Sequence, residues 1–350
     1  MEANLDPLLP LFERERAAGH ALALGVLVRT EGSTYRKPGA LILIARNGDY
    51  AGLISGGCLE GDLREHARAV IDSGTARTVS YDTRGADDLV WGLGLGCEGV
   101  MQILLLRADP ANAWQPLTHL AAALAARDPT AIAVVVESSR ADLPPGSVAL
   151  PANARSTSVS PALATPAVQA ALARARAQGQ TCWVEESSAS VFVLPLSLPP
   201  RVLLLGAGPD TVPVVDFAAR LNWRMTLVDH RASYAVASHF PRAEQVLLAR
   251  PEELSGALDL NGFCAALVMS HHLPSDLLYL RALAASSVGY VGLLGPAARR
   301  DRLLADLGAD AQALRGRLHA PVGLTLGGRS PESVALAIVS QVHAFIFRVL

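Results

Sequence analysis

The alternation of apolar and polar positions changes character near residue 200. Beyond this point, short and almost continuously apolar segments alternate with helical stretches. Apolar strands that alternate with helices are typical of a parallel sheet covered on both faces. The second half of the chain is therefore predicted to form such a sheet. Its strands are expected at 201–205, 225–229, 245–248, 264–270 and 290–294.

The first part of the chain predicts a mixture of helices and turn-linked strands. Asn47-Gly48 is a strong hairpin signal between two apolar segments, and Gly19 and Gly74 stand where helical patterns stop. This pattern indicates an α+β domain. Helices are expected at 6–19 and 59–73, and strands at 21–28, 40–45, 50–54, 77–81 and 100–106.

The middle of the chain is less regular, and 138–165 is rich in Pro, Ser and Ala. The prolines at 195, 199 and 200 form the best candidate linker. We expect an N-terminal domain at 1–196, within which 110–196 can form a separate segment, and a C-terminal domain at 197–350. In the middle segment, helices are expected at 118–126 and 167–178, and strands at 131–137, 182–185 and 190–194.

The last helix of the chain has a well-defined start signal, Ser330-Pro331-Glu332. Serine caps helix N-termini, proline suits the first helical position, and glutamate complements the helix dipole. We therefore expect this helix to begin at Pro331 and to run close to Phe347.

Composition narrows the class of protein. The 350 residues carry 30 basic and 32 acidic side chains, and this balance lacks the basic footprint of a nucleic-acid or anionic-membrane binder. No apolar run approaches the roughly 18 to 20 residues of a membrane span. The acidic N-terminus does not resemble a secretory signal. The four cysteines are too scattered for a disulfide framework. These features predict a cytoplasmic protein with reduced thiols.

A glycine-rich loop follows the first strand of the second half. Gly206 and Gly208 come directly after 201–205, and Asp229 ends the next strand at about the 20-residue spacing of dinucleotide-binding folds. Thr211 stands where the third glycine is expected, and Asp210 is placed to cap the following helix. A carboxylate there opposes a pyrophosphate. A nucleotide fold with an altered phosphate site is therefore as consistent with the sequence as a working one.

His271 and His272 follow the strand at 264–270. They are expected at the carboxyl end of a parallel strand, where open α/β sheets bind ligands, and Asp276 can orient one of them. The alternative is an exposed pair of loop histidines.

Two glycine-flanked cysteines mark the first half. A cysteine at a helix start gains thiolate character, and neighbouring glycines let backbone amides approach a ligand. Cys58 fits this position, because a helix is expected from about Leu59. The alternative is that both cysteines are small buried apolar residues. The distance between them along the chain does not fit a structural zinc site. The candidate residues are Gly56, Gly57, Cys58 and Glu60 in one segment, and Gly96 and Cys97 in the other.

The segment between Gly32 and Gly39 is a second polar island. Hydroxyl and cationic side chains between glycines can cradle a phosphate, whereas the alternative is an ordinary solvated turn. The candidate residues are Ser33, Thr34, Arg36 and Lys37.

Taken together, these motifs resemble the XdhC/CoxI family, the accessory proteins of molybdenum hydroxylases. The resemblance covers both halves of the chain in the order of the family. It implies an α+β N-terminal cofactor-handling domain followed by a Rossmann-like domain. The matching segments are Gly32–Gly39, Ser55–Glu60, Gly94–Cys97, Gly206–Asp210, Val228–Arg231, Met269–His272, Tyr290–Gly295, Pro321–Leu324 and Ser330–Glu332.

The resemblance implies a chaperone without turnover of its own. Such a protein binds molybdenum cofactor (molybdopterin), protects it, assists its sulfuration and inserts it into a xanthine dehydrogenase-like molybdenum hydroxylase. The implied partners are this hydroxylase and a cysteine desulfurase, and a homodimer is expected. Carried over by motif, Cys58 is the first candidate for contacting molybdenum or the sulfur, and the Cys97 loop is the second. Arg36, Lys37 and glycine amides are candidates for holding the phosphate of the pterin.

Two departures from the family pattern leave alternatives open. Glu98 stands where relatives have glycine, and Pro209-Asp210 replaces a His-Val pair. One alternative is an NAD(P)-dependent oxidoreductase with His271 or His272 as acid/base. The other is a regulatory protein that senses a nucleotide in the Rossmann cleft, at Gly206, Gly208, Asp210 and Asp229.

Overall fold

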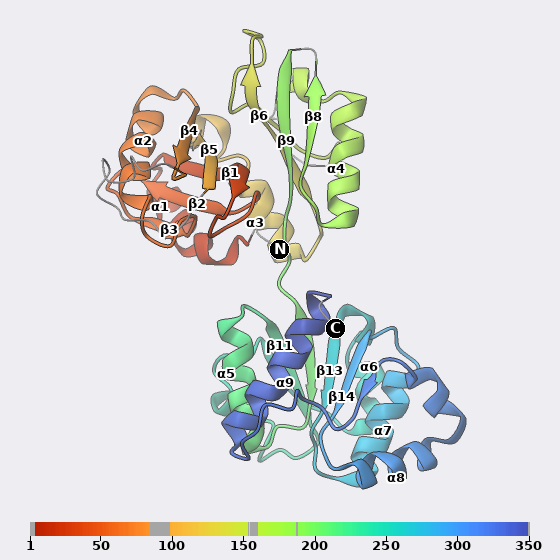
Figure 1. The fold of residues 1–350 in the computed structure, drawn as a ribbon. Coiled ribbons are helices and arrows are strands. Elements are labelled where there is room, and N and C mark those ends of the chain that lie inside the picture. The colour runs from red at the N-terminus through yellow and green to blue at the C-terminus, as the bar shows by residue number, and fades with distance from the viewer. Residues whose placement is uncertain (1–3, 85–98, 153, 155–159, 187, 349–350) are drawn as a thin grey trace. The chain divides into compact units, whose positions relative to one another are not determined.

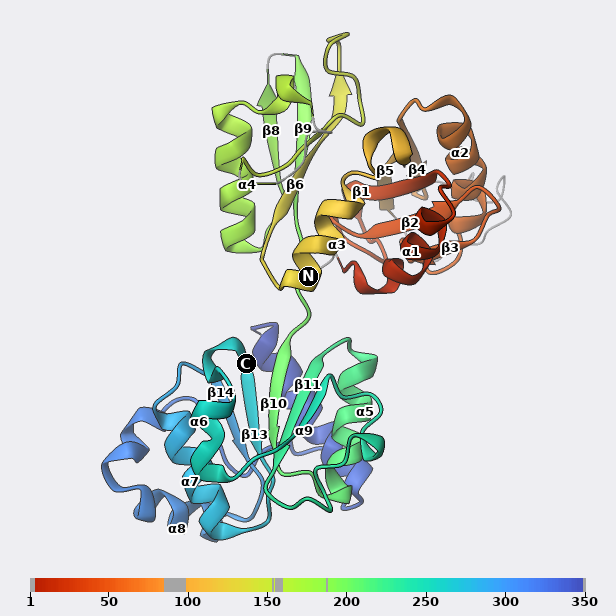
Figure 2. The ribbon, with the colours of Figure 1, turned by 180° about the vertical axis from the view of Figure 1, so that it is seen from behind.

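The computed structural model describes residues 4–84, 99–152, 154, 160–186 and 188–348. The chain divides into two compact units, Met1–Leu198 and Pro199–Leu350. This division lies two residues beyond the predicted boundary, within the proline-rich linker. Figure 1 labels the main elements of both units, and Figure 2 shows them from behind.

The first unit is built on an antiparallel five-stranded sheet in the order β3-β2-β1-β5-β4. One face of the sheet is covered by α2 (Glu60–Ser73), which buries Leu63, Ala67 and Val70 against it. Helix α2 ends where Gly74 takes a left-handed conformation, which glycine adopts without a Cβ penalty. The strands are β1 (Leu22–Gly32), β2 (Leu41–Ala45), β3 (Tyr50–Gly52), β4 (Arg77–Asp82) and β5 (Gly99–Ala108).

The middle segment forms a second sheet within the first unit. Its antiparallel order is β7-β6-β9-β8. One face shares a core with the first sheet and with helices α1 (Leu9–Ala17) and α3 (Leu117–Ala126). The other face is covered by α4 (Pro166–Gln178). The segment therefore packs as a second layer of the N-terminal unit. Its strands are β6 (Ala131–Ser138), β7 (Val148–Ala149), β8 (Cys182–Glu186) and β9 (Ala189–Pro195).

The second unit contains a six-stranded parallel sheet, which confirms the predicted fold class. Its strand order, β12-β11-β10-β13-β14-β15, reverses between β10 and β13, which is the topological switch point of the sheet. Helices α5 and α9 cover one face, and α6, α7 and α8 cover the other. The strands are β10 (Arg201–Leu205), β11 (Arg224–Asp229), β12 (Gln245–Leu248), β13 (Ala265–Val268), β14 (Tyr290–Leu293) and β15 (Leu318–His319). The helices are α5 (Val212–Arg220), α6 (Leu254–Ala257), α7 (Leu273–Ala284), α8 (Ala297–Leu307) and α9 (Pro331–Ile346).

The start of α9 is as predicted. Ser330 caps the helix by accepting a hydrogen bond from the amide of Ser333 at 3.3 Å, and Pro331 is its first residue. The strand predicted at 264–270 is shorter and covers Ala265–Val268, and the chain turns at His271, where φ is 58°. Short 3-10 turns lie at Asp6–Leu8, Pro110–Asn112, Pro161–Leu163, Pro209–Thr211, Ala237–His239, Pro251–Glu253, Leu260–Gly262 and Gly308–Leu314. Among the described residues, no helix has the length and apolar character needed to cross a bilayer.

Candidate functional site

Two of the predicted motif segments border one end of the five-stranded sheet, together with the first residue of β5. The loop 33–39 follows β1, the loop 55–59 follows β3, and Gly99 opens β5. A Cβ on Gly99 would lie 2.6 Å from the carbonyl oxygen of Ser33, so these two backbones are in close contact. A Cβ on Gly56 would lie 3.8 Å from the ring of Tyr35. The loop 33–39 therefore touches both of the other segments.

The loop 55–59 is held in place by the carboxylate of Glu60. The amides of Ile54 and Ser55 donate to Oε1 at 3.1 and 2.9 Å. The Ser55 hydroxyl and the Gly57 amide donate to Oε2 at 2.5 and 3.0 Å. The Ser55 oxygen in turn accepts the amide of Leu59 at 2.8 Å. These bonds shape a tight loop over the first turn of α2.

Glu60 was predicted as a cofactor contact, but its side chain is only 2% exposed and both of its oxygens serve the loop. Burial alone would raise the pKa of this carboxyl. Hydrogen bonds from the Ser55 hydroxyl and from the amides of Ser55 and Ile54 outweigh burial, and the pKa lies below its usual range. Glu60 is therefore an ionised positioning residue.

Cys58 lies exposed on this loop, two residues before the first residue of α2. The preceding Gly56 and Gly57 have φ of 81° and 111°, a conformation that favours glycine and leaves their backbone uncovered. The alternative of a buried apolar cysteine is therefore wrong for Cys58. The second predicted cysteine, Cys97, and its neighbour Gly96 lie outside the described residues.

The polar island 33–37 is partly ordered by its own hydrogen bonds. The Thr34 hydroxyl donates to the carbonyl of Arg36 at 2.8 Å, and the Lys37 ammonium lies 3.4 Å from the same hydroxyl. Ser33 and Lys37 are exposed. An ammonium group has three donors, so Lys37 retains capacity to bind an anion at this edge.

The sequence did not predict a set of hydrogen bonds and ion pairs at the same end of the sheet, made by Thr83 and Arg84. Buried Thr83, just after β4, exchanges hydrogen bonds with Gly99: its hydroxyl accepts the Gly99 amide at 3.1 Å, and its amide donates to the Gly99 carbonyl at 2.9 Å. Arg84 then pairs with Asp82 at 2.7 Å and with Glu31 at 3.3 Å. Neither residue belongs to a recognisable motif, because their roles depend on the pairing of β4 with β5.

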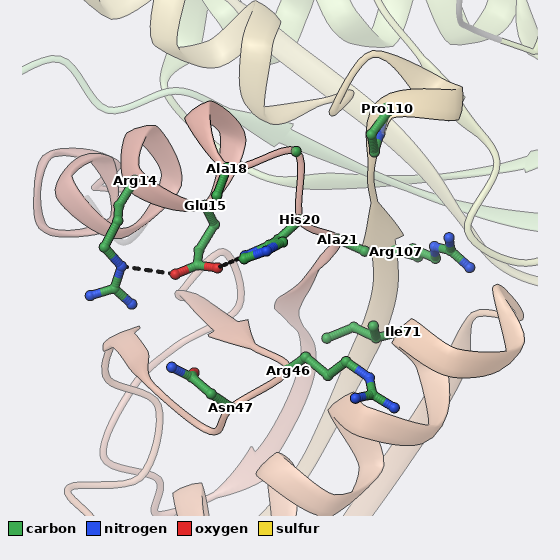
Figure 3. Close-up of a pocket in the computed structure, with 11 residues that line it drawn as sticks. Arg14, Glu15, Ala18, His20, Ala21, Arg46, Asn47, Ile71, Arg107 and Pro110 are labelled. Atoms are coloured by element: carbon green, nitrogen blue, oxygen red, sulfur yellow. Dashed lines mark hydrogen bonds and ion pairs between the residues drawn. The ribbon is translucent and has the colours of Figure 1, made fainter.

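The opposite end of the same sheet contains a cavity of about 870 Å³ (Figure 3). Buried Glu15 accepts from Arg14 Nε at 2.8 Å and pairs with His20 Nδ1 at 2.9 Å inside it. None of the predicted site residues lines this cavity. Its lining residues come from elements far apart in the chain, which leaves no local sequence signal. The lining consists of Arg14, Glu15, Ala18, Gly19, His20, Ala21, Arg46, Asn47, Ile71, Arg107 and Pro110.

In the second unit, the glycine loop lies at the switch point of the sheet, between β10 and β13. A Cβ on Gly206 would lie 2.4 Å from the carbonyl oxygen of Met269 at the end of β13, and the φ of Gly206 is 116°. Only glycine fits this close approach of two backbones. The amide of Ala207, inside the loop, donates to Asp229 Oδ2 at 2.8 Å.

Asp210 does not cap the helix, so that prediction is wrong. No side chain caps the 3-10 turn Pro209–Thr211 or helix α5. Gly208 is the residue before the turn, so Asp210 already lies inside it, and its carboxylate instead pairs with His271 Nε2 at 2.8 Å. The left-handed backbone of His271 carries its ring to this partner.

His272 and Asp276 belong to a neighbouring network. His272 Nδ1 lies 2.9 Å from the hydroxyl of Ser275. Buried Asp276 binds the Ser270 hydroxyl and accepts from Arg299 Nη2 at 2.6 Å. The Asp276 carboxylate thus ties Ser270, just beyond β13, to α8 and has no described contact with either imidazole ring, although the Asp276 amide donates to the His272 carbonyl at 2.9 Å. Among the described residues, no group of histidine, cysteine and acidic side chains is arranged to hold a metal ion.

Comparisons with known proteins cover both units. The model of the XdhC and CoxI family matches residues 15–82, and the model of the XdhC Rossmann domain matches residues 202–342. A Bacillus subtilis protein, described as a probable xanthine dehydrogenase subunit, is 30% identical over 319 residues, which is 91% of each chain.

Two further relatives differ in how much of the chain they cover. The crystal structure of a xanthine dehydrogenase from Bacillus halodurans aligns with a TM-score of 0.79 at 28% identity, covering 99% of this chain and 96% of that one. The uncharacterized protein YqeB of Escherichia coli is 27% identical over 44% of this chain and 28% of its own length.

Proposed function

This chain belongs to the XdhC and CoxI family, and on that premise we propose that it is an accessory factor of a xanthine dehydrogenase-type molybdenum hydroxylase. In this proposal the protein binds molybdenum cofactor, protects it, assists its sulfuration and inserts it into the client enzyme. It works with a cysteine desulfurase, as a cytoplasmic homodimer, and has no turnover of its own.

One observation carries the proposal: two of the N-terminal motifs, Gly32–Gly39 and Ser55–Glu60, meet at one end of a single sheet. The exposed thiol of Cys58 stands on a loop fixed by Glu60, next to the loop that bears Lys37. The described residues thus combine a soft donor with a cationic group. This combination suits a cargo that has a sulfur-rich metal at one end and a phosphate at the other.

The division of labour in this site suits reversible binding. The Cys58 sulfur is the candidate contact for molybdenum or its sulfur ligand, because thiolates are soft ligands. The Lys37 ammonium and the Ser33 hydroxyl are candidates for the phosphate. The Glu60 carboxylate holds the loop and does not face the cargo, since its oxygens are occupied. A carrier must release its cargo, so few strong ligands are an advantage.

The contacts of the second unit carry the oxidoreductase alternative no further. His271 Nε2 pairs with Asp210, and His272 Nδ1 lies beside the Ser275 hydroxyl. Each imidazole ring keeps its other nitrogen for a proton, so these contacts do not distinguish an acid/base residue from a structural one.

The experiment is to purify the full chain anaerobically from a host that makes molybdenum cofactor. Molybdenum and oxidised pterin released from the protein are quantified for the wild type, Cys58→Ala and Cys182→Ala. Cys182 is a matched control, because it is a half-buried thiol on β8 in the second sheet of the same unit.

Near-stoichiometric pterin in the wild type and in Cys182→Ala, with loss in Cys58→Ala, is the expected result. Equal pterin in all three proteins would overturn the role of Cys58. No pterin in any of them, even after cofactor is added, would overturn the carrier function.

A further inference from the structure

The end of β11 in the second unit presents a cation where a dinucleotide-binding fold normally presents a carboxylate. We propose that this unit binds nucleotides that carry a phosphate on the ribose, and that the Arg231 guanidinium recognises this phosphate. The inference concerns the C-terminal unit and stands independently of the proposed cofactor site.

The first step is the state of Asp229. In dinucleotide-binding folds the acidic residue at this position accepts the ribose hydroxyls. Here Oδ1 accepts the amide and Nε of Arg231, both at 2.9 Å. Oδ2 accepts the amide of Ala207 at 2.8 Å and Nη2 of Arg231 at 2.7 Å. A carboxylate has about four acceptor sites, so Asp229 has none left for a ribose diol. Unphosphorylated NAD does not fit this arrangement.

The second step is the presentation of Arg231. Asp229 holds its guanidinium in a two-pronged pair, and the ring of Tyr234 lies 3.9 Å from the guanidinium carbon. Its side chain is 34% exposed, whereas that of Asp229 is 1% exposed. A guanidinium has five N–H donors, of which the pair uses two. The remaining edge is pre-organised for a planar contact with phosphate oxygens.

The third step is location. One oxygen of Asp229 binds both the Ala207 amide in the glycine loop and Nη2 of Arg231, so the guanidinium lies beside that loop. The loop follows β10 at the switch point, where ligands bind in sheets of this topology. The ion pair also removes the charge repulsion that an unpaired Asp229 would exert on a phosphate. The arrangement matches the use of arginine for the 2′-phosphate of NADP.

The fourth step concerns the other end of the ligand. The Asp210 carboxylate lies 2.6 Å from where a Cβ of Gly208 would be, over the loop that normally approaches a pyrophosphate. Its negative charge is shared with His271 but opposes further anions. Recognition is therefore concentrated on the ribose phosphate, and a 5′-pyrophosphate adds little affinity.

Four ligands and inorganic phosphate test the proposal by calorimetry on the full chain: NADP⁺, NAD⁺, 2′-AMP and 5′-AMP. We expect NADP⁺ to bind about tenfold or more tightly than NAD⁺, and 2′-AMP to exceed 5′-AMP similarly, because only one of each pair offers a charge-assisted contact to Arg231. Inorganic phosphate alone should bind far more weakly than 2′-AMP.

The variant Arg231→Ala tests whether the phosphate is recognised by Arg231 itself or is attracted by any positive charge on this unit. The variant loses the phosphate contact and frees the Asp229 carboxylate for a ribose diol, so the preference should reverse toward NAD⁺. Arg242→Ala is the matched control, because Arg242 is a surface arginine of the same unit, 3.7 Å from Asp216. Asp210→Asn should strengthen NADP⁺ binding and leave 2′-AMP binding unchanged.

Several results would overturn the proposal. Equal affinities for NADP⁺ and NAD⁺, or no binding of any of the four nucleotides, would show that the Arg231 pair merely seals the cleft. Phosphate binding as tight as 2′-AMP would show a general anion contact. Unfolding curves of each variant establish that the loss of binding is not a loss of fold. Pterin content, measured separately, shows whether the N-terminal proposal has failed at the same time.

Discussion

Each unit has a glycine-containing loop held by a buried carboxylate: the loop 55–59 is held by Glu60, and the loop after β10 is held by Asp229. The two loops differ in the chemical group that they leave exposed. Glu60 and Asp229 are each almost fully buried, and each accepts four hydrogen bonds from its own chain. Around Glu60, the donors are backbone amides and one hydroxyl, and the loop leaves the Cys58 thiol exposed. Around Asp229, two of the donors belong to a guanidinium, which covers the carboxylate and takes its place at the surface.

This contrast shows which groups are available to a ligand. A carboxylate beside a glycine loop is an obvious candidate binding residue in a sequence, but here the acceptor positions of both carboxylates are occupied by hydrogen bonds from the protein itself. What remains for a ligand is the group that each arrangement leaves uncovered, a thiol in one unit and a guanidinium in the other. The difference lies in a single partner residue, Arg231.

The largest expected effect is the loss of stability when a side chain is introduced where the loop after β10 approaches another backbone most closely. Gly206→Ala should lower the free energy of unfolding by about 3 kcal/mol or more, because its Cβ would meet the Met269 carbonyl oxygen at 2.4 Å with φ at 116°. Neither backbone can yield without breaking the pairing of β10 with β13. Urea unfolding of the variant and wild type measures the change. A loss below about 1 kcal/mol would mean that the two strands separate easily.

The next effect tests whether the two carboxylates are equivalent. Asp229→Asn and Glu60→Gln should each cost about 2–3 kcal/mol, because each turns an acceptor into a donor that faces other donors. Asp229→Asn should cost more, since it also breaks the ion pair with Arg231. Chemical denaturation monitored separately in each unit compares them. A larger loss of unfolding free energy for Glu60→Gln than for Asp229→Asn would contradict the added contribution of the Arg231 ion pair.

A smaller effect sharpens the contrast between the loops. Gly57→Ala should cost about 1–2 kcal/mol, because φ is 111° but no atom lies within 4 Å of the new Cβ. The cost is backbone strain alone, unlike the clash at Gly206. Cys58→Ala, an exposed neighbour, should change the free energy of unfolding by less than about 0.5 kcal/mol. A cost for Gly57→Ala as large as that for Gly206→Ala would contradict an open loop.

The smallest effect is a pH dependence shared by both loops. Burial opposes ionisation of both carboxyls, but hydrogen bonds from Ser55 and its neighbours, and from Arg231 and Ala207, lower both pKa values in the folded protein. A lowered folded pKa contributes stability that is present above the unfolded pKa of about 4 and lost as pH falls through the folded pKa.

We therefore expect the urea midpoint to fall as the pH drops below about 4, where the carboxyls of the unfolded chain take up protons. Glu60→Gln and Asp229→Asn should each reduce this acid sensitivity. A midpoint that rises toward low pH, or variants with the wild-type slope, would contradict the role of these carboxylates.

Local structure was predictable where residues within the same short segment determine it. The start of α9 depends on Ser330 and Pro331, and the end of α2 depends on Gly74, so both could be placed in advance. The predicted strands of the second half lie within a few residues of their observed bounds, because continuous apolar runs identify buried parallel strands. The two-residue strand β15 was missed, because it is too short to have a pattern.

The candidate sites were predictable only in part. Gly206 and Asp229 were identified from their spacing, and Cys58 from its flanking glycines and the helix expected after it. The occupation of Asp229 by Arg231 was not predicted. The pairing of Asp210 with His271 joins residues 61 positions apart, and nothing local distinguishes it from a helix cap. The role of Thr83 arises from its contact with Gly99 across paired strands.

Apolar periodicity and residues within one turn of each other were enough to predict the fold class, the start of α9, the end of α2 and the positions of the two glycine loops, whereas the cap predicted at Asp210 was wrong. Which functional atoms remain open to a ligand depends on contacts between residues far apart in the chain. Whether a side chain is free depends on the hydrogen-bonding partners that the fold brings to it, and buried polar groups must be satisfied by whatever lies nearest in space. In this protein that requirement leaves the Cys58 thiol exposed and fills the acceptors of Asp229 with Arg231.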